Sequence, residues 1–135
     1  MKILEILTPK RLIGNIGERA AARHLKRDGY KIIDRNYTAF DAEIDIIAIK
    51  DGVACFVEVK TRTLGHEDAR EPRPASAVNP EKQRKIIRCA KAFMSSNYKI
   101  QAKMRFDIIE VFLGENKKVA EIKHLISAFN YNTAF

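Results

Sequence analysis

The sequence has little cysteine and no long apolar run. Its two cysteines, Cys55 and Cys89, stand apart, without a CxxC pair or a Cys/His cluster that would suggest zinc. Two reduced, buried thiols are typical of a protein of the cytoplasm. The opening residues, MKILEILTPKRLIG, hold too short an apolar stretch for a signal peptide, and no segment approaches the length of a membrane span. We therefore expect a cytoplasmic location and no membrane partner.

Acidic residues are also in deficit. Lys and Arg number 25 against 17 Asp and Glu, which gives a net charge of +8 and a pI near 9.6. This balance suggests an anionic partner, with nucleic acid as the first expectation and a membrane surface as the second. With 135 residues, 46% of them hydrophobic, the chain is long enough to form one domain with a core.

The central stretch is EIDIIAIKDGVACFVEVK, residues 43–60. Asp51-Gly52 between two apolar runs is a strong signal for a two-residue hairpin turn. Such a turn pairs Lys50 with Val53 and fixes the register of the whole hairpin, so that Asp45 is expected opposite Glu58. Both faces of this hairpin are apolar, which is typical of a strand pair in the middle of a layered fold.

The same register places Glu43, Asp45, Glu58 and Lys60 on one face, together with Ile47, Ile49, Ala54 and Phe56. The opposite face is expected to carry Ile44, Ile46, Ala48, Cys55, Val57 and Val59. Directly opposed carboxylates destabilise a strand pair, so Asp45 and Glu58 suit a hard divalent cation between them. The alternative is a structural salt-bridged strand end, in which Lys60 and Arg62 neutralise the acids.

Around this hairpin the pattern predicts two helices and two further strands. We expect a helix over 13–28, strands over 30–37 and 104–112, and a helix from Pro80 to Ser96 that begins with the N-cap Asn79. His24 is interpreted as a core histidine and Glu18 as an acid at the edge of the apolar stripe. The order of helix, three strands, helix and strand predicts an α/β fold, with a mixed central sheet flanked by helices on both faces.

Two segments carry further functional expectations. Residues 62–78 are polar and contain proline, and we interpret them as a mobile loop over the site, within which His66 could touch a substrate; an inert surface loop is the alternative. The helix from Pro80 has a basic face that suits phosphate contacts. Its basic residues are Lys82, Arg84, Lys85, Arg88 and Lys91. Residues 119–135 are expected to form a tail of short strand or helix.

A set of short motifs spans most of the chain: Gly14-Asn15-Ile16-Gly17-Glu18, Gly29-Tyr30, Arg35-Asn36, Glu43-Ile44-Asp45-Ile46-Ile47-Ala48, Phe56-Val57-Glu58-Val59-Lys60-Thr61-Arg62, Lys82 and Arg105-Phe106-Asp107. In these motifs the chain resembles the YraN family of uncharacterised bacterial proteins, within the PD-(D/E)xK superfamily of restriction endonucleases and Holliday junction resolvases. It departs from the superfamily in three places: Ala42 where the family usually has glycine, no proline before Asp45, and Ile87 four residues after Gln83.

The resemblance implies a restriction-endonuclease-like αβββαβ core in a single domain over 1–135. It implies that Asp45, Glu58 and the carbonyl of Val59 hold Mg²⁺ or Mn²⁺, that Lys60 orients the attacking water, and that Glu18 is an accessory acid and metal ligand. Glu43 is a second accessory acid.

Three hypotheses follow. The first is a metal-dependent phosphodiesterase acting on nucleic acid, DNA before RNA, with phosphates held by Arg62, Lys82, Arg84, Lys85 and Arg88. The second is a non-catalytic nucleic-acid-binding module of the same fold. The third is a protein-binding adaptor in which residues 125–135 form a homodimer or partner surface.

Overall fold

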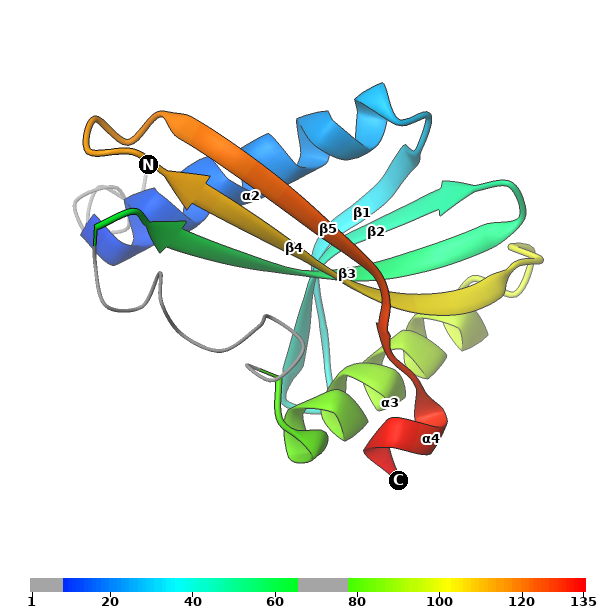
Figure 1. Ribbon diagram of the computed structural model, residues 1–135. Coiled ribbons are helices and arrows are strands. Elements are labelled where there is room, and N and C mark those ends of the chain that lie inside the picture. Colours follow the sequence, from blue (N-terminus) through cyan, green and yellow to red (C-terminus); the bar gives the residue numbers. More distant parts are fainter. Residues whose placement is uncertain (1–8, 66–77) are drawn as a thin grey trace, which may run out of the picture.

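The computed structural model describes residues 9–65 and 78–135, and Figure 1 shows their arrangement. In chain order the elements are α2 (Pro9–Arg27), β1 (Lys31–Ala39), β2 (Ala42–Lys50), β3 (Val53–Thr63), α3 (Pro80–Ser96), β4 (Lys103–Leu113), β5 (Val119–Phe129) and α4 (Tyr131–Ala134).

The strands form one five-stranded sheet in the order β1-β2-β3-β4-β5. All neighbouring strands are antiparallel except β3 and β4, which are parallel because α3 connects them. Helix α2 lies on one face of the sheet and α3 on the other, and the short α4 lies beside α3 (Figure 1). The expected mixed α/β sheet flanked by helices is therefore confirmed, and it agrees with a restriction-endonuclease-like core.

Each face of the sheet has its own apolar core. The core under α3 contains Phe56, Ile47 and Phe93, and the core under α2 contains Leu25, Val57 and Ile109. A strand pair that is apolar on both faces occupies the centre of a sheet, as expected for β2 and β3. Cys55 and Cys89 are free and buried, one in each core.

The register of the β2–β3 hairpin was predicted correctly from its turn, but the prediction holds only for the half of the hairpin next to that turn. β2 and β3 pair from Lys50↔Val53 to Ile46↔Val57, and both turn residues have positive φ, as a two-residue turn of this kind requires. Beyond Val57 the two strands separate. Ile44 was expected on the face of Ile46 but packs in the α3 core, so that part of the prediction was wrong.

The cause lies in the partner strand. Tyr37 still pairs with Ile44 and Arg35 with Ile46, but between them Asn36 adopts a left-handed backbone conformation, φ 53°. A residue of that kind interrupts the alternation of faces, and Tyr37 and Ile44 turn together toward α3. The turn end of the β1–β2 pair bends toward α3 (Figure 1). Period-2 reasoning assumes an uninterrupted strand, and for this reason it misplaced Ile44.

Three boundaries also differ from the expectation. Helix α2 begins at Pro9, earlier than residue 13. Strand β3 continues to Thr63, so the predicted loop over 62–78 does not start at Arg62; residues 66–77, including His66, lie outside the described residues. The tail is a full fifth strand, β5, followed by α4. Of the helices in the described ranges, none is both long and apolar enough to cross a membrane.

Candidate functional site

Asp45 lies where β2 separates from β3. The backbone N–H of Val59 is beyond the last paired residues of this hairpin, and it donates to Oδ2 of Asp45 at 2.8 Å. The carboxylate thus takes the place of a strand carbonyl. This contact holds the Asp45 side chain in the gap between the strands, next to Glu58.

The surroundings of Asp45 are rich in negative charge. Burial and then the carboxylates of Glu58, Glu18 and Glu43 together raise the pKa of Asp45 to about 8, against the opposing hydrogen bond from Val59. The structure therefore brings together the four acids that the sequence singled out, from α2, β2 and β3. The burial of Asp45 and the number of acids around it leave its negative charge poorly compensated.

Helix α2 comes close enough to contribute Glu18 because of Gly17. A Cβ atom built on Gly17 would lie 1.7 Å from Oγ1 of Thr61 on β3, so that only glycine permits this approach. Glu18 then accepts a hydrogen bond of 2.9 Å from Nδ2 of Asn36, which also lies 3.4 Å from Glu43. Asn36 is a site residue that the sequence reasoning missed. An asparagine inside a strand pattern was the available signal, because asparagine tolerates the left-handed conformation.

Glu58 is paired with a lysine from the other face of the sheet. Nζ of Lys82, in the first turn of α3, lies 2.9 Å from Oε1 of Glu58. Lys82 was predicted as a phosphate contact on an open helix face, but the structure places it among the acids. The capping of α3 positions it: Asn79 accepts from the backbone N–H of Lys82, and Pro80 begins the helix, as predicted.

Lys60 lies on β3 beside the same group. Burial and then the nearby ammonium of Lys82 lower its pKa, while Glu58 acts in the opposite direction. An amine in this position holds its proton less tightly than an exposed lysine. It is suited to donate a hydrogen bond next to Glu58.

Two cavities meet at Asp45 and Glu58. One, of about 500 Å³, opens toward α3 and is lined by Asp41, Ala42, Glu43, Asp45, Glu58, Asn79, Glu81, Lys82, Lys85 and Ile86. The other, of about 570 Å³, opens toward α2 and is lined by Lys10, Ile13, Gly14, Glu18, Asp45, Glu58, Val59, Lys60, Thr61 and Thr63. The expected closeness of Asp45 and Glu58 thus holds, although Asp45 is outside the paired register. Asp45 and Glu58 can therefore be reached through either cavity.

The acids do not yet form a closed set of metal ligands. Among the described residues, His24, Asp28 and His124 form a group whose potential ligand atoms all lie within 4.8 Å of one another. The acids around Asp45 are more widely spaced than that. The contacts explain the spacing. Lys82, the Val59 N–H and Asn36 each hold a different carboxylate.

The basic face of α3 is only partly open. Arg84 donates to the carbonyl of Ala134 at 2.8 Å, and Arg88 lies over the ring of Phe135. Both therefore hold the C-terminal residues around α4 in place, a role that was not predicted from the sequence. Lys85 differs, because it lines the cavity that contains Asp45 and Glu58, and its side chain is 45% exposed.

Arg62 was predicted as a phosphate contact but lies inside the protein. It is 8% exposed, and its Nε donates to Oε2 of Glu110 on the neighbouring strand β4. The pairing with Glu110 also differs from the salt-bridged alternative, which expected Arg62 to neutralise the acids near Asp45. His24, expected in the core, has 28% of its side chain exposed and lies 3.4 Å from Asp28.

Comparison with known proteins identifies the chain. The model of a family described as uncharacterised protein family UPF0102 matches residues 17–111. This range contains Glu18, Glu43, Asp45, Glu58, Lys60 and Lys82.

Individual relatives match over nearly their whole length. A UPF0102 protein of Caldanaerobacter subterraneus subsp. tengcongensis is 42% identical over 122 residues, covering 89% of this chain and 96% of the relative. A UPF0102 protein of Chlorobaculum parvum is 43% identical over 124 residues, 87% of this chain and 91% of the relative. One from Clostridium acetobutylicum is 40% identical over 119 residues, 86% and 92%. The chain therefore belongs to the uncharacterised protein family UPF0102, the YraN family that its motifs resemble.

Proposed function

We propose that this protein binds nucleic acid in the cytoplasm and cleaves phosphodiester bonds of DNA as a Mg²⁺- or Mn²⁺-dependent endonuclease. The observation that carries the proposal is the pair Asp45 and Glu58. They lie between two cavities, with Glu18 and Glu43 beside them and the lysines Lys60 and Lys82 in the same place.

The donor set suits the cation. Mg²⁺ and Mn²⁺ prefer carboxylate and carbonyl oxygens, and Asp45, Glu58 and Glu18 would supply them. A divalent cation would also offset the repulsion that raises the pKa of Asp45. To bind it, Glu58 would have to exchange its contact with Lys82 for the metal.

Each residue then has a role. Mg²⁺, when bound, supplies a more acidic water and neutralises charge on the phosphate. Glu58 and Asp45 would hold it, and the N–H of Val59 fixes the Asp45 side chain in place. Lys60 donates a hydrogen bond to the attacking water or to a phosphoryl oxygen as negative charge develops there. Lys82, released from Glu58, provides a positive charge for the same phosphate.

Neighbouring phosphates have fewer candidate contacts than the sequence suggested. Lys85 lines the cavity on the α3 side and Lys10 the cavity on the α2 side. These contacts position a backbone without reading bases, so we expect binding with little sequence preference. The preference for DNA over RNA rests on the resemblance to endonucleases.

A second candidate function is favoured by the Lys82–Glu58 ion pair. If this pair is the final arrangement of the site, Glu58 is already compensated, and the protein is a non-catalytic nucleic-acid-binding module. The basic residues would then act without metal chemistry.

A cleavage assay separates the two. Untagged protein is incubated with branched, single-stranded and duplex DNA in the presence of Mg²⁺, Mn²⁺ or EDTA. We expect cleavage only with the metal, and a loss of at least a hundredfold in Asp45→Asn and Lys60→Ala. Glu121→Gln, on exposed β5, is the matched control and should retain activity.

The same samples give the binding result. If Asp45→Asn binds DNA as wild type does but neither protein cleaves any substrate with either metal, the binding module is the correct description. In that case affinity should fall with salt, and Lys85→Ala should reduce the slope of log K against log salt by about 0.9 on duplex DNA.

A further inference from the structure

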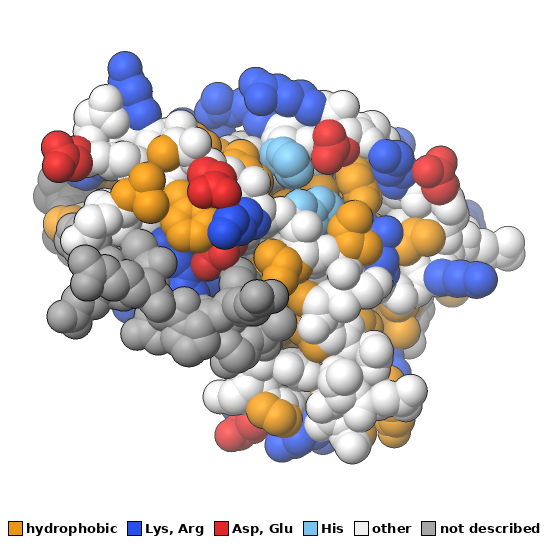
Figure 2. Space-filling model, viewed as in Figure 1, with side chains coloured by type: hydrophobic (Ala, Val, Ile, Leu, Met, Phe, Trp, Pro, Cys, Tyr) orange, Lys and Arg blue, Asp and Glu red, His pale blue; other side chains and the backbone are white. Residues whose placement is uncertain are grey.

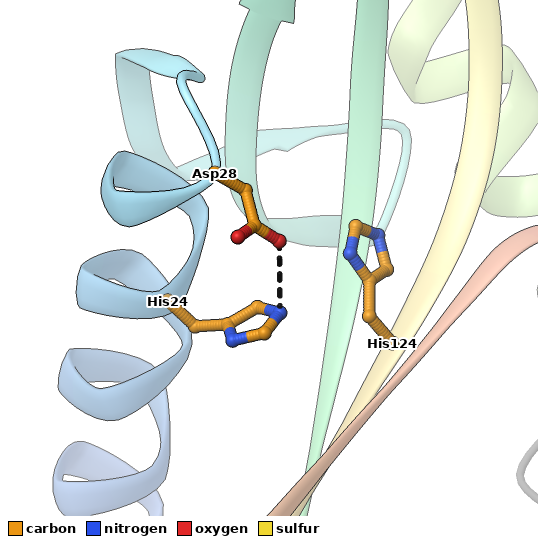
Figure 3. A group of neighbouring side chains, drawn as sticks. All are labelled: His24, Asp28 and His124. Carbon is orange, nitrogen blue, oxygen red and sulfur yellow. Dashed lines mark ion pairs between the residues drawn. The ribbon is translucent and has the colours of Figure 1, made fainter.

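A second group of potential metal ligands lies at the far end of α2. His24 is in the last turn of α2, Asp28 follows the helix, and His124 comes from β5. Nε2 of His24 lies 3.4 Å from Oδ2 of Asp28, and one ligand atom from each of the three residues lies within 4.8 Å of the others. Figure 3 shows the two imidazoles and the carboxylate pointing into one common space.

We propose that His24, Asp28 and His124 form a binding site for a divalent transition-metal ion, with Zn²⁺ as the best fit. Two imidazoles and one carboxylate are typical ligands for zinc, with a fourth position for water. At zinc–ligand bonds of about 2.0–2.1 Å, neighbouring ligand atoms in a tetrahedron lie about 3.3 Å apart. His24 and Asp28 already have that spacing, and His124 has to close by no more than roughly 1.5 Å.

The surroundings of His124 orient it as a ligand. Its Nε2 lies 2.8 Å from Oδ2 of Asp107, which is fully buried. Asp107 also accepts two hydrogen bonds from Arg105 and one from the backbone N–H of Ser127. A carboxylate in these contacts can only accept, so Nε2 of His124 carries the proton. Its other ring nitrogen, Nδ1, then has a lone pair and faces His24 and Asp28 (Figure 3).

This arrangement is more than an ion pair of adjacent side chains. A metal-bound histidine generally donates its second ring N–H to a carboxylate, which fixes the ring and strengthens it as a ligand. Asp107 has that position behind His124. Two positive charges close to the group have partners of their own: Arg105 donates to both oxygens of Asp107, and Nζ of Lys50 donates to the backbone carbonyl of Asp28.

The group is accessible from solvent. Side-chain exposures are 28% for His24, 51% for Asp28 and 9% for His124, so a metal ion could enter from the side of Asp28. Figure 2 shows histidine side chains next to each other at the surface. His24 is six residues after Glu18 on α2, about 9 Å along the helix axis, so the site is separate from the acids. The proposal does not depend on nuclease activity.

Metal binding there would join two elements that are distant in sequence. Helix α2 and the edge strand β5 would be linked by one ion, and ligand binding to the folded state stabilises it by mass action. We therefore expect zinc to raise the melting temperature of the whole domain.

Isothermal titration of Zn²⁺ into untagged, metal-stripped protein tests the site. Asp45→Asn is used as the background, so that zinc at the acidic site does not contribute. We expect one equivalent of Zn²⁺ with micromolar or tighter affinity, weakened at least tenfold by His24→Gln and by Asp28→Asn. His66→Gln is the matched control for unspecific histidine binding and should titrate like its background. Replacing Zn²⁺ with Co²⁺ should give the visible absorption bands of four-coordinate cobalt, and His24→Gln should remove them.

His124→Gln adds a test of geometry, but it removes a partner of buried Asp107 and can destabilise the fold. His24→Gln, at the partly exposed end of α2, therefore decides the outcome, with circular dichroism confirming that the variant is folded. The proposal is overturned if no saturable binding occurs at one equivalent, or if His24→Gln and His66→Gln bind Zn²⁺ equally well.

Discussion

Lys82 and Glu58 form an ion pair across two elements, with 2.9 Å between Nζ and Oε1. Lys82 belongs to α3 and Glu58 to β3, so the pair joins the helix to the sheet at the point where the acids gather. The Lys82 side chain is 42% exposed and Glu58 only 11%. Solvent therefore screens the lysine more than the glutamate, and the lysine is the partner that is free to move.

Replacing Lys82 should reveal whether this pair is a resting state. If Glu58 is a metal ligand, Lys82→Met removes a competing positive charge, and Mg²⁺ affinity should rise several-fold in a calorimetric titration. Cleavage of DNA should fall, because the phosphate loses a contact. Lys85→Met, one turn further along α3 and at a lysine paired with Glu81, is the control for the Mg²⁺ affinity alone. An unchanged Mg²⁺ affinity together with a lower melting temperature would mean that the pair is structural.

The charge state of Asp45 should make stability depend on pH. Its pKa is raised from 3.8 to about 8, so the folded state retains a proton that the unfolded state releases. The free energy of unfolding should then fall as the pH rises from about 4 to about 8. Asp45→Asn should flatten that slope and be more stable than wild type at pH 8, by at most about 5 kcal/mol. Urea titrations at several pH values measure this; a slope that survives in Asp45→Asn would place its origin elsewhere.

The close approach of α2 to the sheet should depend on Gly17. Gly17→Ala would place a methyl group 1.7 Å from Oγ1 of Thr61, and the helix would have to shift. We expect a loss of about 1–3 kcal/mol in unfolding free energy, together with lower activity because Glu18 moves. Gly14→Ala, where no atom lies within 4 Å of the added Cβ, should be neutral or stabilising. Equal effects of the two substitutions on denaturation would contradict this account of α2.

Arg62 should behave as a structural residue. Its guanidinium is paired with Glu110, and both side chains are at most 10% exposed. Arg62→Ala would leave a buried carboxylate without this partner, which costs about 3–5 kcal/mol. Chemical denaturation measures that loss. If Arg62→Ala is as stable as wild type but binds DNA more weakly, the phosphate contact expected from the sequence is the correct role.

Much of the fold was accessible from the sequence because local signals agreed. Asp51-Gly52 fixes the central register, Asn79-Pro80 fixes the start of α3, and apolar periodicity assigns both cores. The acids Asp45 and Glu58 were found because opposed carboxylates on an apolar hairpin need a reason to be there.

The features that were not predicted from the sequence depend on contacts between distant segments. Arg62 contacts Glu110, 48 residues away, and Arg84 contacts Ala134, 50 residues away. The sequence pattern of β3 or α3 does not predict either contact. The His24–Asp28–His124 group was overlooked for the same reason, since a search for close Cys/His spacing excludes ligands that meet only in the fold. Asn36 was missed because its left-handed conformation interrupts a strand that otherwise has a regular pattern.

The melting temperature with and without Mg²⁺ tests the central claim, that Asp45 and Glu58 form a site for a hard divalent cation. At about a hundred times the dissociation constant, a bound ion adds about 2.7 kcal/mol to stability, a shift on the order of 10 °C for a domain of this size. We predict this shift for wild type and for His24→Gln, and its loss in Asp45→Asn. No shift in wild type, or the same shift in Asp45→Asn, would contradict the claim.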